Sequence, residues 1–434
     1  MEANKVCVFG GRCHECGRCR TGSSDSRKEG LTVLSEDFLK TLPSGNTPSF
    51  GVAFDIGTTT VVGMLWELSA HKLMRVVSAA NPQADFGQDV ISRINYCIEE
   101  ADGLSTLQGL IVSCLNDLLE QLTVELPLLP VSRITAVGNT TMCHLLLGRD
   151  PVSLARAPYE PAYRGTVTIP AIELGLKVEA EALLEVLPGI AGHVGSDITA
   201  GIAASGLPDM NGTILYIDVG TNGEIVLMSD GQLAACSAAA GPAFEGASIR
   251  CGTRAIRGAV ERVALTAERI DCVTISHDEP CGICGSGLID AVAQMLKWGI
   301  IDYKGKMKRP GTGDELPPFL QSRLMMTSGG PAFQLTEAVR IYQQDIREVQ
   351  LAKGAILAGC EILLSNAGKT VSDLDRILVA GAFGNYIDPE SALAIGLFPC
   401  VAKDRVVHAG NAAGAGASMA LLSRGIFSKA EETA

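Results

Sequence analysis

The chain has 434 residues, of which 47% are hydrophobic and 19% charged, the composition of a globular α/β protein long enough for two or three domains. Its formal net charge of -13 argues against a nucleic-acid partner, because such proteins usually present a basic surface. No apolar run approaches the ~20 residues of a membrane span, and the N-terminus MEANKVCVFGG lacks a signal-peptide pattern. We therefore expect a cytoplasmic protein without a membrane partner.

Four cysteines crowd the N-terminus with the spacing C-x5-C-x2-C-x2-C: Cys7, Cys13, Cys16 and Cys19. A reducing cytoplasm disfavours a disulfide framework. Two consecutive x2 spacings place three thiolates on one tight loop, as in bacterial-type iron–sulfur sites, although zinc or uncommitted thiols remain alternatives. We expect segment 1–22 to bind an iron–sulfur cluster, preferably [4Fe–4S], with His14 not a ligand, and we interpret 23–50 as a linker.

From Gly51 onward, apolar β-branched runs alternate with Ala/Leu-rich helical patterns, and the sequence repeats itself. VAFDIGTTTVVGML and LYIDVGTNGEIVLM each predict a strand, an Asp-x-Gly-Thr turn and a second strand. ITAVGNTT and ILVAGAFGN each predict a later strand that enters a glycine turn. We expect two α/β halves, 51–210 and 211–434, with the ligand between them and an insertion in the second half around 251–333.

The Asp-x-Gly-Thr turns are candidate phosphate-binding loops, because such a hairpin presents backbone N–H groups and hydroxyls to one point. The candidate phosphate-binding residues are Gly57, Thr58, Thr59, Thr60, Gly220, Thr221 and Asn222. Asp55 and Asp218 would hold Mg²⁺ through its waters. For a single motif, a turn with no ligand is an equally good interpretation. Two copies in matching contexts favour ATP binding.

The downstream segment Gly381, Ala382, Phe383 and Gly384 is expected to let adenosine lie against bare backbone. Hydrolysis also requires a group that orients water, and the candidates are Asp197, Glu224 and Glu245. Asp197 could instead be a helix N-cap together with Ser196, and Glu224 a solvated strand residue.

The ordered motifs FDIGTTT, AVGNTTM, IDVGTNGEI, AAGPAFEGASI, CGSGLIDAV, QQDIREVQLAKGAI and VAGAFGNYID, within about residues 51–420, resemble the ATPase domain of the reductive activators of corrinoid proteins. The resemblance implies the duplicated actin-like fold shared with sugar kinases and heat-shock chaperones (ASKHA) and ATP hydrolysis. It also implies a homodimer, a low-potential electron donor and a corrinoid protein of a methyltransferase system as partner. By motif position Ser237 would approach the partner's cobalt, although Cys236 leaves the register open and a buried packing serine is the alternative.

The cysteine segment departs from this family, many of whose members carry a plant-type ferredoxin domain, whereas only 50 residues precede Gly51 here. A second metal site at Cys251, Cys281 and Cys284 is less favoured than buried packing. Three other functions stay open. They are an activator of a 2-hydroxyacyl-CoA dehydratase or benzoyl-CoA-type reductase, a small-molecule kinase, and a chaperone-like module with zinc in the head.

Overall fold

The computed structural model describes residues 34, 36–42, 49–124, 131–311, 315–381 and 384–434. The contacts divide the described chain into two compact units. The first contains the described residues up to Met210 together with Ala409–Ala434, and the second contains Asn211–His408. The C-terminal segment, which the sequence predicted with the second half, therefore packs in the first unit. The predicted cysteine ligands Cys7, Cys13, Cys16 and Cys19 lie outside the described residues.

The first unit is built on a six-stranded mixed sheet with the order β3-β2-β1-β4-β6-β5. Strands β1 and β2 form an antiparallel hairpin that β3 extends, and β4 pairs with β1 in parallel. Beyond β4, β6 is parallel and β5 antiparallel. The strands are β1 Phe50–Ile56, β2 Thr60–Glu67, β3 Lys72–Ala80, β4 Val131–Gly138, β5 Val167–Pro170 and β6 Leu183–Val186.

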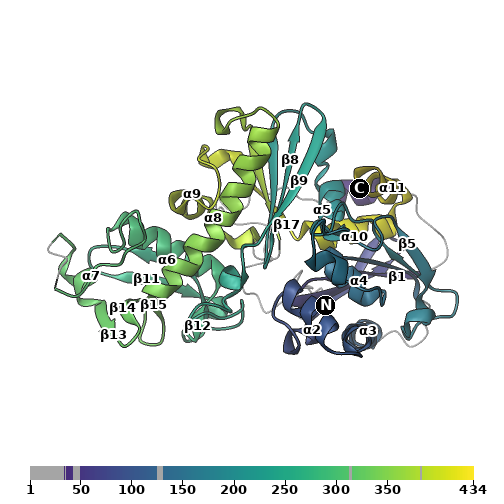
Figure 1. The fold of residues 1–434 in the computed structure, drawn as a ribbon, viewed down its shortest axis with the longest axis horizontal. Helices are drawn as coiled ribbons and strands as arrows, with labels where there is room; N and C mark the ends of the chain where they lie inside the picture. Colours follow the sequence, from purple (N-terminus) through teal and green to yellow (C-terminus); the bar gives the residue numbers. More distant parts are fainter. Residues whose placement is uncertain (1–33, 35, 43–48, 125–130, 312–314, 382–383) are drawn as a thin grey trace, which may run out of the picture. The chain divides into compact units, whose positions relative to one another are not determined.

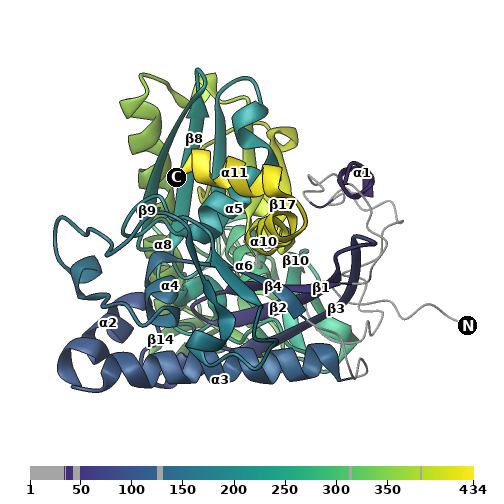
Figure 2. The same ribbon diagram turned by 90° about the vertical axis from the view of Figure 1, so that its right-hand side faces the viewer.

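Helices cover both faces of this sheet (Figure 2). Val52, Phe54 and Ile56 alternate along β1 and pack in one apolar cluster with α3, whereas Ala53 belongs to a second cluster on the opposite face. On that second face α10 packs closely against α5, so that a Cβ at Gly416 would lie 2.1 Å from the Ala200 carbonyl oxygen. The helices are α1 Glu36–Lys40, α2 Val90–Glu99, α3 Gly103–Thr123, α4 Thr140–Leu146, α5 Ser196–Ser205, α10 Ala412–Leu422 and α11 Arg424–Thr433.

The second unit is built on a five-stranded sheet with the order β17-β16-β7-β8-β9. Strand β7 forms an antiparallel hairpin with β8, β9 extends it, and β16 pairs with β7 in parallel. The order β9-β8-β7-β16 repeats the order β3-β2-β1-β4 of the first unit. The strands are β7 Ile214–Val219, β8 Gly223–Ser229, β9 Gln232–Ala238, β16 Arg376–Ala380 and β17 Val406–Gly410.

Between β9 and the long helix α8 the chain builds two small three-stranded sheets, β11-β10-β12 and β13-β14-β15. Figure 1 shows α8 running from these small sheets to the neighbourhood of β8. The strands are β10 Ala259–Leu265, β11 Ile270–Thr274, β12 Gly282–Ile283, β13 Leu324–Thr327, β14 Gly330–Gln334 and β15 Arg340–Tyr342. The helices of this unit are α6 Gly285–Lys297, α7 Pro318–Ser322, α8 Gln343–Asn366 and α9 Pro389–Ile395.

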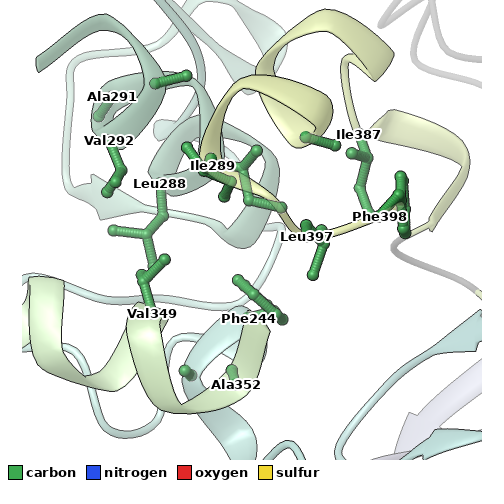
Figure 3. Close-up of a cluster of buried hydrophobic side chains, with 14 of the residues drawn as sticks. Phe244, Leu288, Ile289, Ala291, Val292, Val349, Ala352, Ile387, Leu397 and Phe398 are labelled. Atoms are coloured by element: carbon green, nitrogen blue, oxygen red, sulfur yellow. The ribbon is translucent and has the colours of Figure 1, made fainter. Parts of the chain in front are cut away.

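One apolar core joins these parts of the second unit (Figure 3). Leu288 and Val292 of α6 and Val349 of α8 are buried in it, together with Phe244 of the short 3₁₀ helix Pro242–Glu245. Burying such side chains contributes about 1.5–3 kcal/mol each. The core holds the loop at the start of the Pro242–Glu245 helix at a fixed place relative to the main sheet.

Candidate functional site

The first Asp-x-Gly-Thr loop connects β1 to β2. The Gly57 amide donates to the Thr60 carbonyl at 3.0 Å and closes the turn. A Cβ at Gly57 would lie 2.6 Å from that same carbonyl oxygen, so the turn excludes any side chain at this position. The predicted residues Thr58, Thr59 and Thr60 thus occupy one closed turn, with Thr58 buried.

Asp55 lies at the end of β1, half-buried, and accepts a hydrogen bond from Asn411 Nδ2 at 3.1 Å. Burial raises the pKa of the Asp55 carboxyl to about 6, which the Asn411 bond opposes. A cation beside this carboxylate would favour its charged form, so its environment fits a Mg²⁺ held through water. Among the described residues, no group of three or more acidic, histidine or cysteine side chains could by itself hold a metal ion.

The second loop connects β7 to β8 and is closed by a 3.0 Å hydrogen bond from the Gly220 amide to the Asn222 carbonyl. Here a Cβ at Gly220 would approach only the Asn222 carbonyl, at an ordinary 3.5 Å. The buried Thr221 donates its hydroxyl to the Glu245 carboxylate at 2.5 Å. Glu245, one of the three predicted water-orienting carboxylates, therefore contacts the second loop directly.

Strand register also places Asp218, Glu224 and Ser237 in one row. Asp218 of β7 is opposite Glu224 of β8, and Glu224 is opposite Ser237 of β9. Directly opposed residues share a face of the sheet with Cβ atoms about 4.5–5.5 Å apart. The neighbouring Cys236 lies on the other face, where its Sγ approaches Gly359 of α8. Ser237 rather than Cys236 therefore shares a face with the carboxylates of this loop.

Gly381 follows β16 and lies against the second loop. Ala380 pairs with Asp218, and Gly381 adopts φ +95°, a conformation that favours glycine. A Cβ there would lie 2.6 Å from Asp218 Oδ1. At the other end of the predicted adenosine segment, the Gly384 carbonyl accepts from His408 Nδ1 at 3.1 Å. Ala382 and Phe383 lie outside the described residues.

Asp197 lies in the first turn of α5, in the first unit, and its Oδ1 accepts from the Ile198 amide at 2.9 Å. The N-cap of α5 is Gly195, with no side-chain capping bond, so the alternative that Asp197 and Ser196 cap this helix is wrong. Ser196 instead uses its hydroxyl to bond the Gly138 backbone at the end of β4.

The other cysteines that the sequence singled out, Cys251, Cys281 and Cys284, form no group of three metal ligands within the described residues. The Cys281 thiol is exposed and donates to the Arg257 carbonyl, and the Cys251 thiol lies 3.9 Å from the Ala338 carbonyl. Cys284 is buried, with the Val260 carbonyl 3.4 Å from its Sγ. These separate partners agree with packing rather than a second metal site, although Cys281 is exposed rather than buried.

Three buried polar residues next to the first loop were not predicted from the sequence: Asn81, Arg93 and Asn139. Each donates a hydrogen bond to the first loop. The sequence carried only a weak signal for these residues. Asn139 precedes a helical pattern in AVGNTTM, and Arg93 lies in a helical segment in which polar and apolar residues alternate around it.

A cavity of about 310 Å³ lies in the second unit, and none of the predicted site residues line it. It is bounded by Ala247, Ser248, Ile249, Arg250, Gly329, Tyr342, Gln344 and Asp345.

Comparison with known families matches residues 50–210 to the RACo middle region and residues 212–434 to the C-terminal domain of RACo, the ASKHA domain. The chain is 36% identical over 407 residues to the corrinoid activation enzyme RamQ of Eubacterium limosum, covering 91% of this chain and 68% of that protein. It is 25% identical over 394 residues to a [Co(II) methylated amine-specific corrinoid protein] reductase of Methanosarcina barkeri, covering 83% and 68%.

A solved structure of a reductive activator for corrinoid, iron–sulfur protein superposes with a TM-score of 0.81 at 37% identity. The match covers 90% of this chain and 63% of that one, so the chain spans less than two thirds of the length of this relative. Within the described ranges, no helix combines the length and apolarity needed to cross a membrane. The matched regions, the repeated strand order and the two Asp-x-Gly-Thr turns together show an α/β fold of the ASKHA type. The chain belongs to the RACo family of reductive activators of corrinoid proteins.

Proposed function

We propose that this protein uses ATP hydrolysis to drive one electron onto the cobalt of a corrinoid protein, converting Co(II) to Co(I). The observation that carries the proposal is the pair of closed Asp-x-Gly-Thr turns in a chain of this family. The relatives support it, because their names describe a corrinoid activation enzyme and a reductase of a Co(II) corrinoid protein. The protein would act in the cytoplasm, as expected from the sequence, and as a homodimer, as the family resemblance implies.

At the nucleotide, Asp55 and Asp218 would each hold Mg²⁺ through its waters, because each carboxylate ends a strand beside a phosphate-binding turn. Thr58, Thr59, Thr60, Thr221 and Asn222 supply hydroxyl, amide and backbone donors for phosphate oxygens. Gly381 and Gly384 would border the adenosine. Catalysis of this kind depends mainly on positioning and electrostatics.

For the hydrolytic water we favour Glu224 over Asp197. Glu224 is buried and is the direct cross-strand neighbour of Asp218. The Asp197 carboxylate is engaged with the backbone of its own helix. Glu245 is expected to orient Thr221 through their 2.5 Å hydrogen bond rather than to contact water itself.

The electron would come from an external low-potential donor. Cys7, Cys13, Cys16 and Cys19 offer four thiolates at a spacing that suits an iron–sulfur cluster, which would supply a one-electron carrier when bound. Each ~59 mV of uphill potential makes a one-electron transfer tenfold less favourable. ATP hydrolysis can overcome this only if the nucleotide states differ in affinity for the partner's two states.

The partner's cobalt would approach Ser237. This serine is half-buried on β9 and directly opposite Glu224. One row of side chains thus links the cobalt-facing hydroxyl to the carboxylates of the second loop, so that a nucleotide-dependent shift at that loop would reach the docking residue.

The test is to measure ATP hydrolysis and cobalt absorbance together in anaerobically purified protein, with a strong reductant and a Co(II) corrinoid protein. We expect iron in the purified protein, a Co(I) band that requires ATP, and faster hydrolysis when the corrinoid protein is present. A Co(I) band of equal size without ATP, or the absence of any Co(I) band with every corrinoid protein encoded nearby, would contradict the proposal.

A further inference from the structure

Three buried residues, Asn81, Arg93 and Asn139, donate hydrogen bonds to the carbonyls of the first Asp-x-Gly-Thr loop and to one of its hydroxyls. We call these three residues the brace. Asn81 donates through Nδ2 to the Gly57 carbonyl and through its backbone amide to the Thr59 carbonyl, both at 2.9 Å. Arg93 donates through Nη2 to the Thr58 carbonyl at 2.5 Å. Asn139 donates through Nδ2 to the Thr58 hydroxyl at 2.9 Å.

The brace is continuous and almost entirely buried. Arg93 is 0% exposed, Asn81 1% and Asn139 8%. Nitrogens of Asn81 and Arg93 both approach the sulfur of Met142, whose backbone amide donates to Asn139 Oδ1. Arg93 also donates to Gln83 Oε1 and to the Gly87 carbonyl, which fixes its guanidinium in one orientation. Buried polar side chains whose hydrogen bonds are satisfied in this way rigidify the backbone that they bond.

The brace determines which way the loop's peptide groups face. In a trans peptide the C=O and the following N–H point in opposite directions. The carbonyls of residues 57, 58 and 59 all accept from the brace, so the amides of residues 58, 59 and 60 point away from it. Successive amides directed to one side form an anion-binding nest. The arrangement turns the loop's acceptors inward and its donors outward.

We propose that the brace preorganises this nest for a phosphate group, and that Arg93 is a positioning residue for nucleotide binding. The inference rests on the proposed nucleotide site and adds three residues to it. Because the brace acts on the phosphate-facing amides, its loss should lower the affinity for each ligand in proportion to the number of phosphate groups that the ligand carries. If the brace had a purely structural role, its loss would lower the affinity for all ligands equally or for none.

The experiment compares the affinities of the full-length protein for MgATP, MgADP and adenosine in wild type, Arg93→Met, Arg93→Lys and Asn139→Ser. Serine at 139 can still cap α4, because its hydroxyl can accept from the Met142 amide, but it is too short to replace the bond to Thr58. The matched controls are Arg133→Met, which breaks an ion pair with Glu185, and Asn116→Ser, which breaks bonds to Gly175 and Lys177.

For Arg93→Met we expect MgATP affinity to fall about 10-fold or more, MgADP affinity to fall less, and adenosine affinity to stay unchanged. Arg93→Lys and Asn139→Ser should give the same ranking with smaller losses, and the controls should show none of it. Should Arg93→Met fail to fold, the ranking in Asn139→Ser decides. Equal losses for ATP and adenosine, or no loss in any brace variant, would overturn the inference while leaving the proposed function intact. A wild-type protein that binds no MgATP would remove both.

Discussion

The two Asp-x-Gly-Thr loops share a strand–turn–strand order but differ in how the turn closes and in what surrounds it, since Gly57 bonds Thr60 in the first and Gly220 bonds Asn222 in the second. The first is held from behind by the brace, and its turn has no room for a Cβ at Gly57. The second leaves ordinary room at Gly220, while carboxylates lie around it, with Asp218 and Glu224 in one row and Glu245 bonded to Thr221. The two copies thus keep the strand–turn–strand order, whereas the closing hydrogen bond and the surrounding side chains differ.

This divergence indicates a division of roles. Inward-facing acceptors and outward-facing amides suit the first loop to hold phosphate oxygens. Carboxylates repel phosphate by themselves, but a single carboxylate such as Asp218 suits Mg²⁺ held through its waters, and Glu224 suits an oriented water. The first loop is therefore the better candidate for rigid binding, and the second for chemistry and for signalling to the partner through Ser237.

The largest effect is expected from Asp218→Ala. Loss of this carboxylate would remove a Mg²⁺-orienting group beside Glu224, and we expect hydrolysis to fall about 100-fold or more, as for removal of a single electrostatic contact at other catalytic sites. Asp55→Ala should lower Mg²⁺-dependent turnover to a similar extent. The measurement is the steady-state ATPase rate over a range of Mg²⁺ concentrations, with circular dichroism to confirm folding. Unchanged turnover in both variants would remove the nucleotide site as described.

The next effect comes from the glycines, which offer a matched pair. Gly57→Ala would place a Cβ 2.6 Å from the Thr60 carbonyl, whereas Gly220→Ala would meet nothing closer than 3.5 Å. We expect Gly57→Ala to distort the first loop and lower MgATP affinity about 10-fold or more, and Gly220→Ala to stay within about 3-fold of wild type. Equilibrium binding checks both. Equal sensitivity of the two glycines would break the comparison between the loops.

Smaller effects are expected from substitutions of Glu224 and Glu245, and they should distinguish the roles of these two carboxylates at the second loop. Glu224→Gln keeps the size of the side chain and removes its charge, and we expect kcat to fall about 10–100-fold with little change in KM, because an oriented water matters only in the transition state. Glu245→Gln should mainly raise KM, since it weakens the hold on Thr221. The reverse pattern in steady-state kinetics would assign the water to Glu245.

Ser237 lies at the other end of the cross-strand row formed with Asp218 and Glu224, and its substitution tests the role of that row. Ser237→Ala should leave basal ATP hydrolysis within about 3-fold of wild type but reduce the stimulation by a Co(II) corrinoid protein, because the proposed function assigns this hydroxyl to the docking of the partner. The matched variant is Cys236→Ala, whose side chain lies on the opposite face against α8. If Cys236→Ala abolishes the stimulation and Ser237→Ala does not, the role assigned to the row is wrong.

Much of this could be read from the sequence, because both turns are short-range features: the Asp, the Gly and the flanking strands lie within about 15 residues, and local pattern predicts them well. The ASKHA fold followed from the ordered motifs. The brace could not be predicted in the same way. Arg93 is 35 residues from Thr58, and Asn411 is 356 residues from Asp55, so their contacts arise only from tertiary packing. The N-cap interpretation of Asp197 was wrong because Gly195 takes that place.

The smallest effect on activity is expected from Asp290→Asn. Asp290 lies outside both loops, so this variant changes how the stability of the fold depends on pH without changing the proposed nucleotide site. Asp290 lies on α6, 7% exposed, and burial raises its pKa to about 7, with smaller opposing contributions from Ser391, the Val263 amide and Arg262 and a reinforcing one from Asp388. Its unfolded value is the ordinary 3.8, so the folded state holds one more proton between about pH 4 and pH 7. The stability of the wild type must then fall as pH rises through this window, by up to about 1.4 kcal/mol per pH unit.

The asparagine variant lacks this titration while its amide oxygen can still accept from Val263. We therefore expect the two proteins to melt at similar temperatures near pH 4, and the variant to be more stable by about 1–3 kcal/mol at pH 8, with ATPase kinetics unchanged at a fixed pH. Melting curves from pH 4 to pH 8 make the measurement, and parallel curves for the two proteins would show that this carboxyl stays ionised.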